Sequence, residues 1–375
     1  MRRVTIRRDK WVLPVSAAVL AAGLLMIVFF LPGPKYPVLL AHLKSIFLTL
    51  VILLLAYGLG LKLLRLMALA HGKDDPGSDN DIAHSAGKYF GQLSELEAFC
   101  FGTGLGLGIL AYAVFLLALL QLLTPLWVMG LLVLAALCLP TEVIRLYRTY
   151  QADPIIPFEP SRKRRRSCGV HFIVAWFLIL LPVVFSFISS LSPPHQSDEL
   201  RYHLAVPDQY VQHGGWFYIR DNAFSNFPFT LEMLYAIGLV FQQDTACRLI
   251  HWSYFVLTLL MLYAIGKRFS GSFAGLLSAA VYACIPFAPI LASWAFIEVG
   301  MTFYYLLCLY GLALWVNVQY IRLARQDLSR TDVALAYSKK LALLCGMGCG
   351  LTLGVKYTAL FLWLFVLGTM ILVIA

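Results

Sequence analysis

The polar stretch SPPHQSDELRYHLAVPDQYVQHGGWFYIRDNAFSNFPFTLE, residues 192–232, is the longest polar and aromatic insert between the apolar segments of this chain. It opens with two adjacent carboxylates, Asp198 and Glu199. The sequence before it has the pattern of membrane anchors, and the sequence after it has the pattern of a helical bundle. We therefore expect residues 192–232 to form the loop around which the apolar segments are arranged.

The composition is that of an integral membrane protein. Of the 375 residues, 61% are hydrophobic and 13% are charged, whereas a soluble domain has roughly 45–50% apolar and about 25% charged residues. The formal net charge is +10, but the basic residues cluster at the ends of apolar segments, where the positive-inside rule expects them. We therefore expect membrane lipids, and no nucleic acid, among its partners.

The apolar runs predict the fold. A helix needs about 20 apolar residues to cross a bilayer, and ten runs are candidate spans: 11–31, 42–65, 97–122, 125–146, 171–191, 246–265, 272–294, 299–321, 341–354 and 357–375. The predicted fold is an all-α, polytopic transmembrane helix bundle of about ten spans. The last two runs could form one kinked helix, but two helices divided near Lys356 are favoured. A shorter run, 231–241, is expected to dip into the membrane or lie at its interface.

Two regions are predicted along the chain. Residues 1–168 form an N-terminal membrane anchor region with four spans and cytoplasmic loops, and residues 169–375 form the core. The first apolar run follows five basic residues and is too long for a typical signal sequence, so an uncleaved first span is expected. Because Ala375 lies inside an apolar run, the core is expected to be truncated at its C-terminus.

The segment GTGLGLG, residues 102–108, has glycines spaced like part of a dinucleotide-binding motif. That motif follows a strand and opens a helix, whereas this segment lies inside a long apolar run. Close helix packing at small residues is the favoured interpretation.

Lys and Arg residues predict the orientation, because cytoplasmic loops are enriched in both. Basic residues precede the first span, and the count of spans places three further basic groups on the same side: 162–166, 267–268 and 322–340. The N-terminus is therefore expected in the cytoplasm. The same count places residues 192–245, Glu298 and Lys356 on the outer face.

The outer loop carries the first candidate acidic site. Asp198 and Glu199 follow a candidate span and a Ser-Pro-Pro breaker, and apolar residues downstream share one helical face. This pattern predicts one or two amphipathic helices on the outer membrane surface, broken at Pro207. Such helices would hold a carboxylate near the lipid headgroups. The alternative is a solvated acidic loop.

Glu298 is the only Asp, Glu, Lys or Arg between Arg268 and Arg322. A charge in a span costs about 2–3 kcal/mol at the bilayer centre and less near the surface, so Glu298 is expected to face a cavity or a partner. The alternative is a carboxylate that stabilises a helix N-terminus. Lys356 either extends to the interface or neutralises a phosphate. Glu232 either caps a short helix or faces the same cavity.

The histidines and cysteines show no metal-ligand spacing and no CxxC pair. His195, His203, His213 and His251 are therefore expected to make polar contacts.

Four segments together carry a family resemblance. They are DELRYHLAVPDQYVQHG, SNFPFTLEMLYAIGLVFQQDTACRLIHW, AFIEVGMTFYYLLCLYGLALW and GLTLGVKYTAL. In these motifs the chain resembles bacterial membrane glycosyltransferases of the family 39 type, which belong to the GT-C superfamily. The resemblance covers residues 170–375 and implies a GT-C-type bundle. It implies a sugar donor linked to polyprenyl phosphate and a lipid, glycan or protein acceptor at the outer face.

The resemblance also implies roles for the acidic residues. The family's first outer loop carries an Asp that acts as general base, which falls on Asp198 with Glu199 beside it. A second acidic residue opens a later span, and Glu298 occupies that place where the family usually has Asp. The implied reaction is an inverting sugar transfer, with a base within about 3 Å of the acceptor hydroxyl.

A departing lipid phosphate needs a positive charge. Lys356, Arg201 or a divalent cation such as Mg²⁺ or Mn²⁺, held by Asp198 and Glu298, would supply it. Tyr202, His203 and Glu232 are expected to support the site.

Two other functions stay open. In a transporter or lipid flippase, Glu298 and Lys356 would be substrate or coupling charges, with inverted repeats around them. A non-catalytic relative is the third possibility. For the transferase, the expected location is the bacterial inner membrane, with the active site on the periplasmic or outer face.

Overall fold

The computed structural model describes residues 38–67, 93–137, 169–324 and 331–374, together with Leu69 and Leu139. Within these ranges the chain is helical and contains no strand. The first predicted span, 11–31, and the basic group 162–166 lie outside the described residues.

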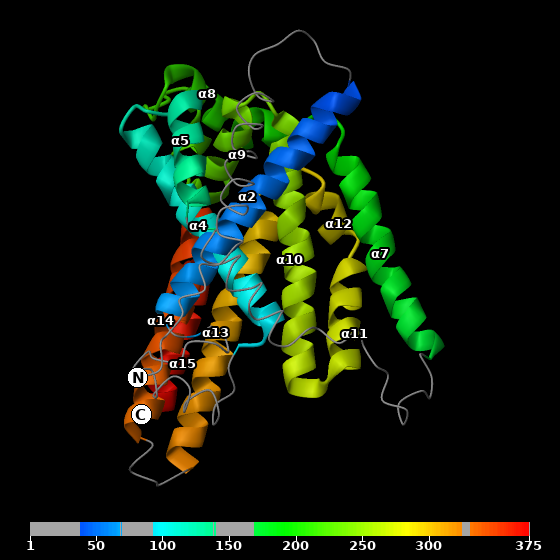
Figure 1. Ribbon diagram of the computed structural model, residues 1–375, viewed down its shortest axis with the longest axis vertical. Coiled ribbons are helices and arrows are strands. Elements are labelled where there is room, and N and C mark those ends of the chain that lie inside the picture. Colours follow the sequence, from blue (N-terminus) through cyan, green and yellow to red (C-terminus); the bar gives the residue numbers. More distant parts are fainter. Residues whose placement is uncertain are drawn as a thin grey trace, which may run out of the picture.

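The described helices form one bundle (Figure 1). Five of them are long and apolar enough to cross a membrane: α2 (Val38–Leu66), α4 (Glu95–Leu119), α7 (Val170–Ser190), α10 (Asp244–Ser270) and α13 (Glu298–Ala324). The others are α5 (Pro125–Ala136), α8 (Ala205–His213), α9 (Thr230–Val240), α11 (Ser272–Ala283), α12 (Phe287–Ala292), α14 (Thr331–Val355) and α15 (Leu360–Ile374). An all-α bundle is thus confirmed for the described residues, five of whose helices are long and apolar enough to span a membrane; the count of ten spans and the GT-C type stay predictions.

Small residues bring α2 and α4 together. A Cβ on Gly60 would overlap the carbonyl of Gly102, and a Cβ on Gly106 would overlap the carbonyl of Ala56. The two backbones can approach this closely only because glycine has no side chain. The packing interpretation of residues 102–108 is confirmed.

The two ends of the bundle differ in charge. In Figure 1, α8 and α9 lie at the upper end and the turn between α10 and α11 lies at the lower end. Basic residues occupy the last turns of α2, α10 and α13: Arg65, Lys267, Arg268 and Arg322. Asp198 and Glu199 precede α8, at the other end of α10. This separation fits the predicted orientation, which stays a prediction.

The predicted helix 272–294 is wrong as a single element. It is divided into α11 and α12 by a turn at Cys284–Pro286. Proline has no N–H to donate and disfavours helical geometry in the residue before it, so Pro286 ends one helix and begins the next. The predicted division near Lys356 is confirmed, because Lys356 has extended backbone between α14 and the 3₁₀ turn Tyr357–Ala359 that leads into α15.

One expectation for the outer loop is also wrong. Pro207 does not break a helix, because it lies in the first turn of α8, where a missing N–H is tolerated. The helix ends instead at Gly214, whose φ is +82°. The short run 231–241 forms α9, which is buried along almost its whole length, and its place in the membrane or at the interface stays a prediction.

An ion pair connects α4 and α10 at the lower end of the bundle. Glu97 of α4 is 2% exposed, and its two carboxylate oxygens each lie 2.6 Å from a nitrogen of Arg268 in α10. The hydroxyl of Tyr310 in α13 donates to the same carboxylate. These bonds join a helix of the predicted anchor region to two helices of the predicted core.

Candidate functional site

The adjacent carboxylates Asp198 and Glu199 have different surroundings. Asp198 is the residue before a single π-helical turn, Glu199–His203, and its side chain is half-buried. π-Helical turns are rare in proteins, but those that occur are often found at functional sites. The hydroxyl of Tyr202 lies 3.4 Å from Asp198 Oδ2. Asp198 is therefore the member of the pair that a substrate can reach.

Glu199 is fully buried and fully engaged. Its Oε1 lies 3.0 Å from Nε of the buried Arg248 and accepts a hydrogen bond from the backbone N–H of Ala295 at 2.6 Å. Its Oε2 accepts from the backbone N–H groups of His195 and Gln196, each at 3.1 Å. Glu199 therefore fits the predicted supporting role and does not face a substrate.

Arg248 ties the start of the outer loop to α10. Its Nη1 donates to Ser192 Oγ at 2.7 Å, to the carbonyl of Pro193 at 3.2 Å and to the carbonyl of Ser192. A buried guanidinium needs both a counter-charge and acceptors: Glu199 provides the charge and the loop provides acceptors for Nη1, whereas Nε and Nη2 have no hydrogen-bond partner among the described residues. The turn that carries Asp198 is thereby fixed against the bundle.

The segment 294–296, which leads into α13, is held by buried side chains. His251 Nδ1 donates to the carbonyl of Trp294 at 2.7 Å, and Tyr235 donates to the carbonyl of Phe296. The N–H of Val299 donates to His251 Nε2 at 3.3 Å. This pair of bonds requires the neutral imidazole with its proton on Nδ1. Glu298 therefore projects from a rigid backbone.

Glu298 and Lys356 form an ion pair at the outer-loop end. Glu298 Oε1 lies 3.5 Å from Lys356 Nζ, and the two side chains are 39% and 35% exposed. Glu298 Oε2 also accepts from the N–H of Ile297 at 3.2 Å. The pair is partly open, so a negatively charged group can approach the ammonium.

His203 and Glu232 form a second, buried pair. His203 Nδ1 lies 2.8 Å from Glu232 Oε1, and each residue is 1% exposed. His203 Nε2 and Glu232 Oε2 have no hydrogen-bond partner among the described residues. The imidazole also packs against Tyr202, with ring centroids 4.0 Å apart, and against Phe296 at 5.3 Å.

Tyr202 is close enough to three acidic residues for their charges to affect its phenol. Burial, followed by the charges of Asp198, Glu298 and Glu232, raises the pKa of its phenol. Tyr202 therefore stays a neutral hydrogen-bond donor at physiological pH. Its ring stacks on Phe224 at 4.7 Å.

An aromatic wall extends from Tyr202 towards Lys356. Phe227 lies 6.4 Å from the ring of Tyr202 and 5.6 Å from that of Tyr357, the residue after Lys356. Arg201 is exposed, and its guanidinium lies 6.0 Å above the ring of Phe224. Arg201 is thus available to a ligand but makes no ion pair with another described residue.

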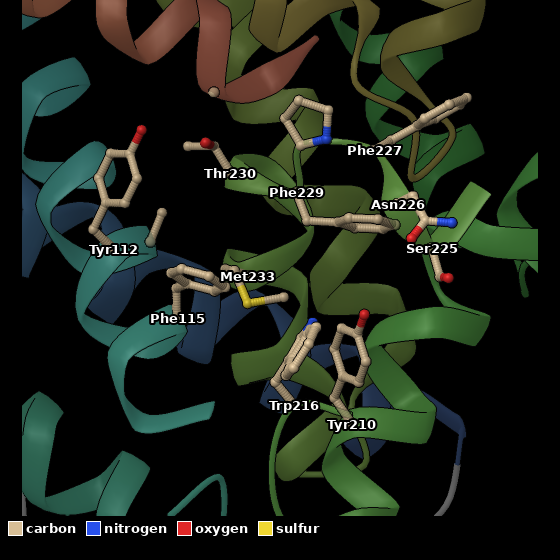
Figure 2. Close-up of a pocket in the computed structure, with 13 residues that line it drawn as sticks. Tyr112, Phe115, Tyr210, Trp216, Ser225, Asn226, Phe227, Phe229, Thr230 and Met233 are labelled. Carbon is tan, nitrogen blue, oxygen red and sulfur yellow. The ribbon is translucent and has the colours of Figure 1, made fainter. Parts of the chain in front are cut away.

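A pocket of about 390 Å³ opens beside this wall. Figure 2 shows Tyr112 and Phe115 of α4 on one side and Ser225, Asn226 and Phe227 of the outer loop on the other. Thr230 and Gly354 also line it, two residues before Glu232 and two before Lys356. Phe227, which lines the pocket and packs against Tyr202 and Tyr357, connects it to the residues around Asp198 and Lys356.

Sequence reasoning named Asp198, Tyr202, His203, Glu232, Glu298 and Lys356, and the fold places all six at one end of the bundle. It did not identify Arg248 as the partner of Glu199. An arginine in an apolar helix, four residues after Asp244, was the available signal.

The predicted divalent cation has little support from the donor set. Among the described residues, no three His, Cys, Asp or Glu side chains gather as a metal site, and Glu298 is already neutralised by Lys356. The cation stays a prediction, and no step below depends on it.

Comparisons of the chain with protein-family models, with curated proteins and with solved structures find no match. The residues of the site are therefore the basis of the function proposed below.

Proposed function

We propose that the protein is an inverting membrane glycosyltransferase of the GT-C type, which transfers a sugar from a polyprenyl-phosphate donor to an acceptor at the outer membrane face. One observation carries the proposal. A half-buried carboxylate, Asp198, lies 3.4 Å from the hydroxyl of Tyr202, whose phenol also experiences the charge of Glu298, and Glu298 is paired with the partly open ammonium of Lys356.

Asp198 is the general base. Its carboxylate takes the proton of the acceptor hydroxyl as the acceptor oxygen forms a bond to the anomeric carbon. The bond between that carbon and the phosphate oxygen breaks, and the electron pair leaves with the lipid phosphate. Because attack and departure occur on opposite faces, a single displacement inverts the anomeric centre.

Lys356 stabilises the departing phosphate. The developing negative charge needs a fixed positive group in a partly water-excluded site, and Lys356 is held in place by Glu298 at 3.5 Å. Arg201, exposed at the same loop, is a second group that a phosphate can reach. Glu199, Arg248 and His251 act as positioning residues, because they hold the two acidic segments and face no substrate.

The test is sugar transfer by purified protein in liposomes that contain a panel of polyprenyl-phosphate sugars and acceptors. Asp198→Asn is expected to abolish transfer while insertion and melting temperature stay unchanged. Asp208→Asn is the matched control, because Asp208 is a carboxylate of the same loop that only accepts from Gln212, at 2.6 Å. Full transfer by the Asp198→Asn protein would refute the assignment of the base. Movement of the lipid across the bilayer without cleavage of the sugar bond would favour a transporter.

A further inference from the structure

The pocket beside the ionic site is aromatic and carries no formal charge. Tyr112, Phe115, Trp216, Phe227 and Phe229 contribute rings to it, and none of its described lining residues is Asp, Glu, Lys, Arg or His. A phosphate or another ion placed here would have no counter-charge. The occupant that this lining favours is therefore uncharged.

Two hydroxyls that line the pocket lack hydrogen-bond partners among the described residues. They belong to Thr230, which is 6% exposed, and to Tyr112, which is 49% exposed. Both hydroxyls meet at Gly354, where a Cβ would lie 2.6 Å from the Tyr112 oxygen and closer still to Thr230 Oγ1. The absence of a side chain at Gly354 thus leaves both hydroxyls open to the cavity.

These features select between two uncharged occupants. An isoprenoid or acyl chain would cover the Thr230 hydroxyl without bonding to it, which costs about 1–3 kcal/mol for a buried polar group. A sugar ring offers hydroxyls to Thr230, Tyr112 and Asn226 and apolar C–H faces to the aromatic rings. The lining therefore fits a ligand that is polar at its edge and apolar on its faces.

We propose that this pocket binds an uncharged sugar ring. Its role in transfer rests on the proposed function, and its position suits that role. Phe227 lines the pocket and packs towards both Tyr202 and Tyr357. A ring bound here lies next to the groups assigned to the reaction. The ring belongs either to the donor or to a glycan acceptor.

The test is binding of methyl glycosides of glucose, mannose, galactose and N-acetylgalactosamine to the full chain in nanodiscs, followed by saturation-transfer NMR. Gly354→Val fills the space between the two hydroxyls. Gly350→Val is the matched control, because Gly350 lies one turn earlier on α14 and a Cβ there meets nothing within 4 Å. Thr230→Val removes one hydroxyl at nearly constant volume and guards against misfolding of the Gly354 variant.

We expect at least one glycoside to bind wild type and Gly350→Val equally, and to bind Gly354→Val and Thr230→Val about tenfold more weakly or not at all, a difference of about 1.4 kcal/mol. Equal binding to all four proteins overturns the proposal. So does binding of undecaprenyl phosphate to the pocket with no glycoside binding.

Failure of sugar binding can be distinguished from failure of the proposed transfer reaction. Glycoside binding is measured without a donor, so loss of transfer and loss of binding are read independently. If Gly354→Val loses transfer but still hydrolyses the donor, the pocket holds the acceptor sugar. If donor hydrolysis is lost as well, the pocket holds the donor sugar.

Discussion

Glu199 Oε1 and the backbone N–H of Ala295 form a hydrogen bond of 2.6 Å between segments that are 96 residues apart in the sequence. Ala295 precedes Glu298 by three residues, so this bond fixes the distance between the acidic outer loop and the start of α13. The carboxylate next to the predicted base therefore acts on the geometry of the second acidic residue.

Removal of Glu199 is expected to destabilise the protein. Glu199→Ala leaves the buried Arg248 without its counter-charge, and breaking a buried pair from one side typically costs about 3–5 kcal/mol. Thermal unfolding in detergent measures the effect, with Asp208→Ala as the control, expected within about 0.5 kcal/mol of wild type. Equal stability of the two variants would show that Glu199 is not an anchor.

The Glu298–Lys356 pair is expected to matter for transfer and little for stability. Because both side chains are more than a third exposed, the pair contributes about 0–1 kcal/mol to folding. Lys356→Met is nevertheless expected to lower kcat by about 10²–10³, the usual effect of removing a group that stabilises developing charge. Melting temperature and initial rate, measured on the same preparation, separate the two effects. A large loss of stability with an unchanged rate per folded molecule would contradict the role of Lys356.

Substitutions of Glu232 test the role of its buried hydrogen bond with His203. Glu232→Gln keeps an oxygen that can accept from His203 Nδ1, whereas Glu232→Leu leaves that N–H buried without an acceptor, at a cost of about 1–3 kcal/mol. We expect Glu232→Leu to lose stability and transfer, and Glu232→Gln to retain most of both. If Glu232→Gln loses transfer at full stability, the negative charge itself takes part in the reaction.

The ion pair at the opposite end provides a contrast. Glu97→Ala removes a carboxylate that accepts hydrogen bonds from Arg268 and Tyr310, and we expect a loss of about 1.5–3 kcal/mol of stability, the usual range for hydrogen bonds to a charged group. Transfer per folded molecule should be unchanged, because the pair lies at the far end of the bundle. Urea unfolding and active-site-normalised rates measure the two quantities. A selective loss of transfer would instead indicate coupling between the ends.

The sequence was sufficient where a pattern has one physical solution. Glycines inside the apolar run 102–108 could only pack closely against another helix, and they do so against α2. The break near Lys356 was visible because a charge interrupts two apolar runs. Sequence also named the candidate site, since unpaired charges are rare in apolar segments.

The other features of the fold and of the candidate site could be recognised only from tertiary contacts. Asp198 and Glu199 are equivalent in sequence, and only the position of Arg248 shows that Glu199 is the buried anchor. Glu97 begins the predicted span 97–122, and only Arg268 and Tyr310 show how its carboxylate is accommodated in a buried position. The break at Pro286 was missed because hydrophobicity outweighed the proline signal.

The wall of the pocket that Tyr112 and Phe115 provide comes from α4, whereas the reacting groups come from residues 170–375. One wall of the proposed ligand pocket and the proposed reacting groups are therefore encoded in separate stretches of the gene. If the proposed function holds, substitutions at Tyr112 and Phe115 can alter ligand preference without altering the residues that react.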